Sequence, residues 1–261
     1  MKAKKSFGQN WLRDNYVLDK IVDSAQVDSD DTVLEIGPGL GTLTQKLLET
    51  DCSVVAVEAD RDLIPNLEKI FRNQPNFKLI NEDILKFDLS DMAKGYKVVA
   101  NIPYYLTSNL IRNLLETHNV PSLMVLLVQK EVAERILARP GQMSVLAFSV
   151  QYYAKPEYVM DVKKELFDPI PKVDSAVIRI ILHQKPLFEA DHQKLFRLVK
   201  AGFGEKRKML RNSLSGGLGI DSSQTESILD KSKIKRTARA QELSMNDWHR
   251  LYLVSLAKGV I

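Results

Sequence analysis

The sequence predicts an α/β fold with a mostly parallel sheet, followed by a small helical domain. Two observations predict the sheet. Short runs rich in valine, isoleucine and leucine alternate with amphipathic segments between residues 32 and 185, and most of these runs are apolar throughout, as in strands covered on both faces. A third observation marks the second domain, because the composition changes at Gln184-Lys185-Pro186 and the chain beyond has a helical pattern. We therefore assign residues 1–186 to the first domain and residues 187–261 to the second.

The predicted elements of the first domain alternate along the chain, and this order implies right-handed crossovers between parallel strands. Two longer strand candidates, 156–162 and 175–182, face each other across a proline-containing loop, and we expect them to pair antiparallel at one edge. In the second domain, Gly216, Gly217 and Gly219 are expected to interrupt the helical pattern. The remaining strand candidates are 32–36, 53–57, 77–80, 97–100 and 123–128, and the helical candidates include 41–50, 61–71, 108–117, 190–201, 206–214, 225–230 and 240–253.

Composition excludes several classes of protein. The 261 residues carry a net charge of +4 and 44% hydrophobic residues, which is ordinary for a globular protein. Cys52 is the single cysteine, so no internal disulfide forms, and we expect a buried thiol in a reducing compartment. The four histidines are scattered without metal-ligand spacing, and no run approaches the roughly 20 apolar residues of a membrane span. We expect a cytoplasmic monomer that uses neither a metal nor a membrane.

A glycine loop follows the first predicted strand. Gly37, Pro38, Gly39 and Gly41 lie where the backbone must turn sharply and where a ligand can approach it closely. Glu58 ends the next strand, 21 positions after Gly37, where an acidic side chain accepts hydrogen bonds from ribose hydroxyls. This part of the pattern fits NAD as well as S-adenosylmethionine.

Two further details favour S-adenosylmethionine over NAD. The spacing is Gly-x-Gly-x-Gly rather than Gly-x-Gly-x-x-Gly, and Glu35 precedes it inside the strand. Asp83 and Ile84 follow the third strand, where a carboxylate can meet an adenine amine. Because ligands of open sheets bind at the carboxyl ends of strands, we expect these segments to form one cofactor site.

An amide, a proline and an aromatic residue end the fourth predicted strand as Asn101, Ile102, Pro103 and Tyr104. The lone pair of an aromatic amine is delocalised into its ring, so an enzyme that methylates it must accept the amine hydrogens. The Asn101 side chain and the Ile102 carbonyl can accept them, while Pro103 restricts the backbone. Tyr104 can stack on one face of the base and Phe167 on the other. Together with the glycine loop, these residues predict methyl transfer to the amino group of a base.

Basic residues gather outside these motifs. One such cluster can be a solvated helix face, but three clusters in a chain with a base-binding site favour contact with nucleic-acid phosphates. Tyr105, which follows Tyr104 in the chain, is expected to be a core aromatic and not part of the acceptor site. The clusters comprise Lys2, Lys4, Lys5 and Arg13, then Lys194, Arg197, Lys200, Lys206, Arg207, Lys208 and Arg211, and then Lys231, Lys233, Lys235, Arg236 and Arg239.

Several of these motifs belong to five longer segments: residues 5–12, 35–41, 101–104, 129–135 and 167–177. Together these segments resemble the rRNA adenine dimethyltransferases, and within them the small-subunit KsgA family. The resemblance implies a class I methyltransferase fold of seven strands with the last antiparallel, and a small helical C-terminal domain. It implies dimethylation of two adjacent adenosines in the 3′-terminal hairpin loop of small-subunit rRNA within a ribosomal assembly intermediate.

The resemblance also implies roles for single residues. Asn10 and Leu12 close over the methionine part of S-adenosylmethionine, and Gly37, Glu58 and Asp83 bind it together with Asn101. The match extends into the tail, where we expect rRNA contacts from Lys206, Arg207, Lys208 and Arg211, with Lys4 and Lys5 adding to them at the N-terminus. One departure is that Trp11 stands where the family commonly has phenylalanine.

Two other functions share parts of the pattern. The large-subunit macrolide-resistance methylases have the same cofactor motifs and the Asn-Ile-Pro-Tyr segment, although segments 129–135 and 172–177 favour the small-subunit branch. A non-catalytic RNA-binding assembly factor on the same scaffold is the other alternative, and the intact Asn101 and Tyr104 argue against it. A small-molecule methylase leaves the basic tail unexplained.

Overall fold

The computed structural model describes residue 4, residues 8–205 and residues 207–261. The chain forms two compact units: residues 1–134 with 155–183, and residues 135–154 with 184–261. The chain passes from the first unit to the second for the last time between residues 183 and 184, close to the predicted boundary at residue 186. Segment 135–154, however, was assigned to the first domain and belongs to the second unit.

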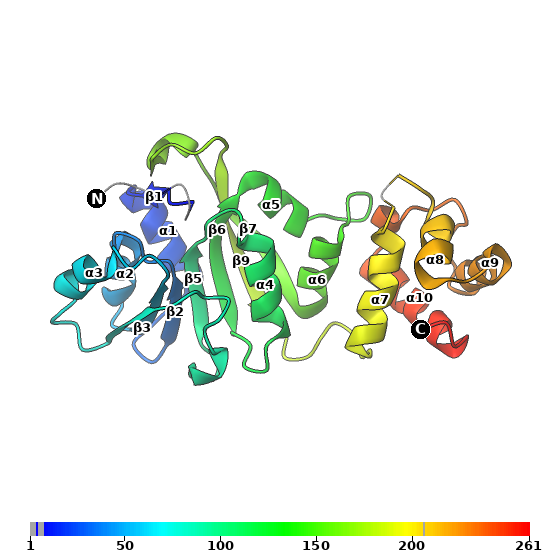
Figure 1. Ribbon diagram of the computed structural model, residues 1–261, viewed down its shortest axis with the longest axis horizontal. Helices are drawn as coiled ribbons and strands as arrows, with labels where there is room; N and C mark the ends of the chain where they lie inside the picture. Colours follow the sequence, from blue (N-terminus) through cyan, green and yellow to red (C-terminus); the bar gives the residue numbers. More distant parts are fainter. Residues whose placement is uncertain (1–3, 5–7, 206) are drawn as a thin grey trace. The chain divides into compact units, whose positions relative to one another are not determined.

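The first unit is built on a seven-stranded sheet in the order β4-β3-β2-β5-β6-β9-β7. The five strands from β4 to β6 are parallel, as predicted, and β9 pairs antiparallel with β6. Figure 1 shows β3, β2, β5 and β6 side by side in this order. The predicted neighbours β9 and β7 lie at one edge. The strands are β2 (Thr32–Ile36), β3 (Ser53–Glu58), β4 (Phe77–Asn81), β5 (Lys97–Asn101), β6 (Leu123–Gln129), β7 (Ala154–Val162) and β9 (Ser175–Leu182).

Helices cover both faces of this sheet. The chain leaves β2 toward β3 and β4 and then returns to β5 on the other side of β2, so right-handed crossovers place the helix after β5 on the opposite face. One core cluster joins the apolar faces of the first three helices to alternate residues of the strands. The reversal of strand order between β2 and β5 creates the crevice where ligands of such sheets bind. The helices are α1 (Asn15–Ala25), α2 (Thr42–Leu48), α3 (Ile64–Ile70) and α4 (Thr107–Glu116), with α5 (Lys130–Ile136) after β6.

Helix α1 was not predicted, although the sequence contains a signal for it. Asp14 caps the helix by accepting a hydrogen bond from the Val17 amide at 2.9 Å. Val17, Leu18 and Ile21 are buried at helical spacing. A two-stranded ribbon was also missed, in which β1 (Trp11–Leu12) pairs antiparallel with β8 (Phe167–Asp168). It joins segments 155 residues apart, and a pairing of two residues leaves no recognisable pattern in a sequence.

The second unit is helical and has an aromatic core. Phe148 of α6 packs against Phe196 and Trp248, with ring centroids 5.8 Å apart in both pairs. This burial explains why α6 belongs here: an apolar helix must be covered, and the aromatic side chains of this unit cover it. The helices are α6 (Val145–Tyr153), α7 (His192–Phe203), α8 (Leu210–Leu218), α9 (Ser222–Lys231) and α10 (Met245–Ala257).

The prediction that Gly216 and Gly217 break the helical pattern was wrong. Helix α8 runs through both residues and ends before Gly219, which has a left-handed φ of 70°. A Cβ atom at Gly217 would lie 2.7 Å from the Cβ of Ala201 on α7, closer than real Cβ contacts come. The missing side chain at Gly217 therefore lets α7 and α8 approach each other closely, and only Gly219 ends the helix.

Candidate active site

A cavity of about 550 Å³ opens at the carboxyl ends of the parallel strands in the first unit. It lies where the strand order reverses, between the loop after β2 and the loop after β5. Glu58 and Asn101 are the last residues of β3 and β5, so the sheet itself fixes their positions. Other residues of the cavity wall include Gly8, Gln9, Asn10, Trp11, Ile36, Gly37, Gly39, Asn81, Glu82, Asp83, Ile84, Ile102, Pro103, Tyr104 and Tyr105.

The glycine loop needs its glycines for two physical reasons. Gly37, Gly39 and Gly41 all have positive φ values, of 70°, 61° and 82°. A Cβ at Gly41 would lie 2.7 Å from the Phe71 ring, whereas a Cβ at Gly37 would meet nothing within 4 Å. The loop is thus tightly packed behind Gly41 and has open space beside Gly37, which lines the cavity.

Glu58 holds the loop and the cavity wall together. Its carboxylate accepts hydrogen bonds from the Gly39 amide at 3.1 Å and from the Asp60 amide at 2.8 Å. The Asn81 side chain donates to the Glu58 carbonyl at 2.8 Å and so ties the ends of β3 and β4. Burial raises the pKa of Glu58. A carboxylate has about four acceptor positions, so Glu58 has acceptor capacity beyond these two hydrogen bonds.

Asn101 is fixed by the N-terminal segment. Its Nδ2 atom donates a hydrogen bond to the Asn10 carbonyl at 3.1 Å, and the Asn10 side chain donates to the Gly8 carbonyl at 3.2 Å. Within the described residues the Asn101 Oδ1 atom accepts no hydrogen bond, which leaves an acceptor at the cavity wall. Asn10 and Asn101, 91 residues apart in the sequence, thus lie together.

The backbone and ring that follow Asn101 are also held in place. The Ile102 amide donates to the Leu127 carbonyl of β6 at 3.3 Å. The Tyr104 hydroxyl lies 2.9 Å from the Ser175 hydroxyl of β9, and its ring is half-buried in the cavity wall. Burial raises the pKa of Tyr104, so its phenol is neutral at physiological pH.

A polar cluster centred on Asp60 was not predicted from the sequence. This carboxylate is 3% exposed, lies 2.6 Å from the Lys4 ammonium and accepts a hydrogen bond from the Gln9 amide at 2.9 Å. Lys4 also pairs with Asp62 at 2.6 Å, so two carboxylates hold the ammonium that was predicted to contact RNA. A signal for the cluster was present, since Asp60 follows Glu58 by two positions at the end of a buried strand.

The other predicted site residues occupy different environments. Asp83 is exposed and Ile84 is buried, and both line the cavity. Leu12 and Phe167 face each other in the β1–β8 ribbon, and their side chains belong to the core cluster. Pro38 is buried, and its carbonyl accepts the Gly41 amide at 2.9 Å. The parts of Leu12, Pro38 and Phe167 in binding stay predictions.

Tyr105 corrects one expectation. It was predicted to be a core aromatic, but its side chain is 63% exposed and lines the cavity. The reason is its position: Tyr105 follows the strand end and precedes α4, which begins at Thr107, so no apolar layer covers it. Cys52, in contrast, is fully buried as predicted, and burial raises the pKa of its thiol.

Basic residues of the second unit differ in how they are paired. Lys208 lies 2.5 Å from Glu205, and Arg211 lies 3.3 Å from Glu226. On α7 the exposed side chains of Lys194, Arg197 and Lys200 form no ion pair within the described residues. Arg207 is exposed too. Lys5 and Lys206, both predicted RNA contacts, lie outside the described residues.

Two negative findings concern the described part of the chain. No group of three or more histidine, cysteine, aspartate or glutamate side chains there has an arrangement that holds a metal ion. None of the helices there has the length and apolar composition of a membrane span.

The doubly wound sheet, with a glycine loop after β2, an acidic residue ending β3 and Asn-Ile-Pro-Tyr after β5, defines a class I methyltransferase. A family model described as ribosomal RNA adenine dimethylase matches residues 1–255. The chain belongs to this family.

Individual relatives agree with this assignment. A protein of Dehalococcoides mccartyi named ribosomal RNA small subunit methyltransferase A is 43% identical over 257 residues, covering 97% of this chain and 88% of the relative. A dimethyladenosine transferase of Plasmodium falciparum is similar in structure, with a TM-score of 0.84 and 28% identity over 95% of this chain and 98% of that one. A 23S rRNA methyltransferase, ErmE, has a TM-score of 0.76 and 28% identity over 94% and 99%.

Proposed function

We propose that this chain transfers methyl groups from S-adenosylmethionine to the N6 amino groups of two adjacent adenosines in the 3′-terminal hairpin loop of small-subunit rRNA. One observation carries the proposal: Asn101 and Tyr104 share a single cavity wall with Gly37 and Glu58. The small-subunit branch is favoured over the large-subunit branch because relatives that are 40–44% identical are named small-subunit methyltransferases. ErmE is 28% identical.

The cavity residues fit S-adenosylmethionine chemically. Its ribose carries hydroxyl donors, for which the Glu58 carboxylate would supply acceptor positions. Its adenine has an amine donor for the Asp83 carboxylate and an apolar ring that can lie against Ile84. The open space beside Gly37 allows a ligand to approach the backbone. When bound, S-adenosylmethionine supplies an activated methyl group.

The chain's own residues prepare the acceptor amine. The Asn101 Oδ1 atom and the Ile102 carbonyl accept the two amine hydrogens, so the nitrogen lone pair is available for attack. Asn10 holds the Asn101 amide, and the Leu127 carbonyl holds the Ile102 backbone. The Tyr104 ring stacks on the base, and Ser175 fixes its hydroxyl. The charged product amine loses its proton readily, so no general base is required.

The proposed function predicts a specific methylation product. Wild-type protein with labelled S-adenosylmethionine should convert two adjacent adenosines of unmethylated small subunits to dimethyladenosine, and it should leave 23S rRNA unlabelled. Mapping the label on both rRNAs checks this. Label in 23S rRNA alone would identify the large-subunit activity, and no label in either rRNA would favour the non-catalytic assembly factor.

For the cofactor, we expect Glu58→Ala to weaken S-adenosylmethionine binding by about 1–3 kcal/mol, because the ribose hydroxyls lose an acceptor. Glu58→Gln, which keeps one carbonyl oxygen, should fall between this variant and wild type. Titration calorimetry measures the affinities. Glu68→Ala, an exposed change on α3, is the control. Equal affinity of Glu58→Ala and wild type would refute the cofactor assignment.

The second unit is proposed to dock the enzyme on rRNA phosphates. Phosphate contacts position a protein without reading sequence, and the energy they provide can offset the cost of extracting a base from its loop. The exposed cations of α7 are better placed for this than Lys208 and Arg211, which are already paired with glutamates.

Two triple variants test the docking, one of three basic residues on α7 and one of three basic residues near the start of α8. Replacing each set of basic residues with glutamine should weaken binding to small subunits and reduce the salt slope by roughly one per lost phosphate contact. Cosedimentation between 50 and 200 mM salt measures both quantities, and cofactor affinity should stay unchanged. Wild-type binding by both variants at physiological salt would show that these faces are only solvated. The sets are Lys194, Arg197 and Lys200 on α7, and Arg207, Lys208 and Arg211 near the start of α8.

A further inference from the structure

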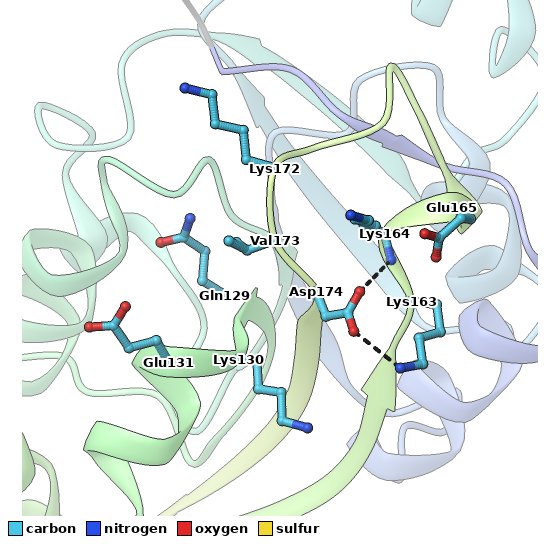
Figure 2. Close-up of a pocket in the computed structure, with 9 residues that line it drawn as sticks. All are labelled: Gln129, Lys130, Glu131, Lys163, Lys164, Glu165, Lys172, Val173 and Asp174. Atoms are coloured by element: carbon cyan, nitrogen blue, oxygen red, sulfur yellow. Dashed lines mark hydrogen bonds and ion pairs between the residues drawn. The ribbon is translucent and has the colours of Figure 1, made fainter.

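A second pocket of about 730 Å³ lies in the first unit, apart from the cofactor cavity (Figure 2). Three segments form it: the end of β6 with the start of α5, the turn before β8, and the loop that leads into β9. Its residues take no part in the chemistry described above. They are Gln129, Lys130, Glu131, Lys163, Lys164, Glu165, Lys172, Val173 and Asp174.

The pocket lies close to the acceptor site in the same sheet. Gln129 of β6 is the register partner of Ser175 of β9, whose hydroxyl is 2.9 Å from the Tyr104 hydroxyl. Asn101 of β5 is the register partner of Leu127, two residues before Gln129. Neighbouring strands lie about 4.8 Å apart, so the pocket is roughly 10 Å from the Asn101 side of the cavity. The nucleotide next to a bound adenosine can reach this distance.

Internal contacts fix the walls of the pocket. Lys163 pairs with Asp174 at 3.2 Å, and the Lys164 amide donates to the same carboxylate at 3.0 Å (Figure 2). The Lys130 amide donates to the Asp174 carbonyl at 3.1 Å, and its ammonium pairs with Asp161 at 2.9 Å. The hydrogen bond from the Lys164 amide and the Lys163 charge hold the pKa of Asp174 below its usual range. Asp174 therefore stays ionised and joins the three segments.

The remaining charged side chains are free to meet a ligand. Lys164 and Lys172 form no ion pair within the described residues, and Figure 2 shows them on different walls of the pocket. Glu131 and Glu165 are also unpaired there, and Figure 2 places Glu131 on the far side from Lys164. Among the described residues of the lining, Val173 is the only apolar one and none is aromatic. The described lining thus offers charged and amide groups to a ligand and no ring on which a base could stack.

We propose that this pocket binds the ribose-phosphate backbone of the nucleotide adjacent to the target adenosine, an inference that rests on the proposed function. Lysine ammonium groups are point charges that suit phosphate oxygens. The carboxylates and the Gln129 side-chain oxygen can accept hydrogen bonds from ribose 2′-hydroxyl groups. Two free lysines and two free glutamates leave little net charge, which disfavours a free multivalent anion. An RNA strand whose adenosine is already bound presents the neighbouring phosphate at high effective concentration. A site of low intrinsic affinity is therefore sufficient to bind that phosphate.

Kinetics with unmethylated small subunits test the pocket. For Lys164→Ala/Lys172→Ala we expect KM for subunits to rise about tenfold or more, kcat to stay within about twofold, and the salt slope to fall by about one to two. Cofactor affinity should stay at the wild-type value, which shows that the unit is folded. The Lys164→Arg/Lys172→Arg variant should restore most of the loss because it retains both charges.

The matched control is Lys69→Ala/Lys78→Ala, which removes two exposed lysines near β4, the opposite edge of the sheet. Equal KM values for this control and the pocket variant would overturn the proposal, as would a fall in kcat with KM unchanged. Inorganic phosphate at constant ionic strength should inhibit no more than chloride; phosphate inhibition lost in the pocket variant would instead reveal a free-anion site. Absence of methylation by wild-type protein would refute the proposed function itself and is therefore a distinguishable result.

Discussion

Asn101→Ala should lose about 100- to 1,000-fold in turnover at saturating cofactor, the loss typical of removing one preorganised hydrogen-bond group at a reacting centre. The structure gives the reason. Asn101 ends β5 at the cavity wall, its Nδ2 atom is bound to the Asn10 carbonyl, and its Oδ1 atom is left to accept an amine hydrogen. Without this acceptor the attacking nitrogen keeps its lone pair in the ring. Labelled methyl transfer to unmethylated small subunits measures the loss.

Two features make this measurement decisive. Saturating cofactor is required because Asn101 is also predicted to contact S-adenosylmethionine. Asn81→Ala is the matched control, because Asn81 also lines the cavity but donates its side-chain hydrogen bond to the Glu58 carbonyl. We expect this variant to retain turnover within about tenfold. Wild-type rates of dimethyladenosine formation by Asn101→Ala under these conditions would contradict the mechanism.

Glu35→Gln should make the first unit more stable at pH 8 than the wild-type chain. Glu35 lies in β2, is 1% exposed and has a carboxylate oxygen, Oε2, with no hydrogen-bond partner in the described part of the chain. Burial raises its pKa from 4.5 to about 8, and the nearby negative charge of Glu58 acts in the same direction. The folded state therefore keeps the Glu35 proton across a range of pH in which the unfolded chain has lost it.

The sign of the pH dependence follows from this difference. Below pH 4.5 both states are protonated, so Glu35 adds no pH dependence. Between pH 4.5 and about 8 the folded state binds more protons, so stability falls as the pH rises, by up to about 1.4 kcal/mol per pH unit. Glutamine removes this dependence. The gain of Glu35→Gln over wild type should grow to roughly 4 kcal/mol at pH 8.

Urea unfolding without cofactor measures this gain at pH 5 and pH 8. Because a chain of two compact units need not unfold in one step, Trp11 fluorescence in a Trp248→Phe background is used to report on the first unit alone. Glu68→Gln, an exposed change on α3, should show no pH-dependent gain. A pH-independent difference between Glu35→Gln and wild type would mean that Glu35 is ionised in the folded protein.

The parallel sheet and the chemistry at the ends of its strands were predictable from the sequence. Buried parallel strands form apolar runs, and the second and fourth predicted runs each extend in the structure by one polar residue, Glu58 and Asn101. Because parallel strands end at the same edge of a sheet, their shared direction was enough to expect both residues at the edge where ligands bind. The glycine spacing is equally local, since positive φ is a property of single residues.

Contacts between distant segments were decided by the tertiary structure alone. The Asp60 cluster, the Asn10–Asn101 hydrogen bond and the β1–β8 ribbon each join segments more than 50 residues apart. A glycine is required at position 217 because α7 packs too closely against α8 for a Cβ atom there. Tyr105 is exposed because no layer covers the start of α4.

The sequence by itself thus determined the sheet, the cofactor motifs and the acceptor segment, because periodicity, backbone freedom and strand polarity are written into short stretches of chain. The tertiary structure decided which side chains are paired, buried or free. Lys4 and Arg211 are engaged by acids while Lys164, Lys172 and the α7 cations are not, although all are equally basic in the sequence. The reason is physical: a charge is neutralised by whatever the fold places within about 4 Å of it, and that neighbour is seldom adjacent in the chain.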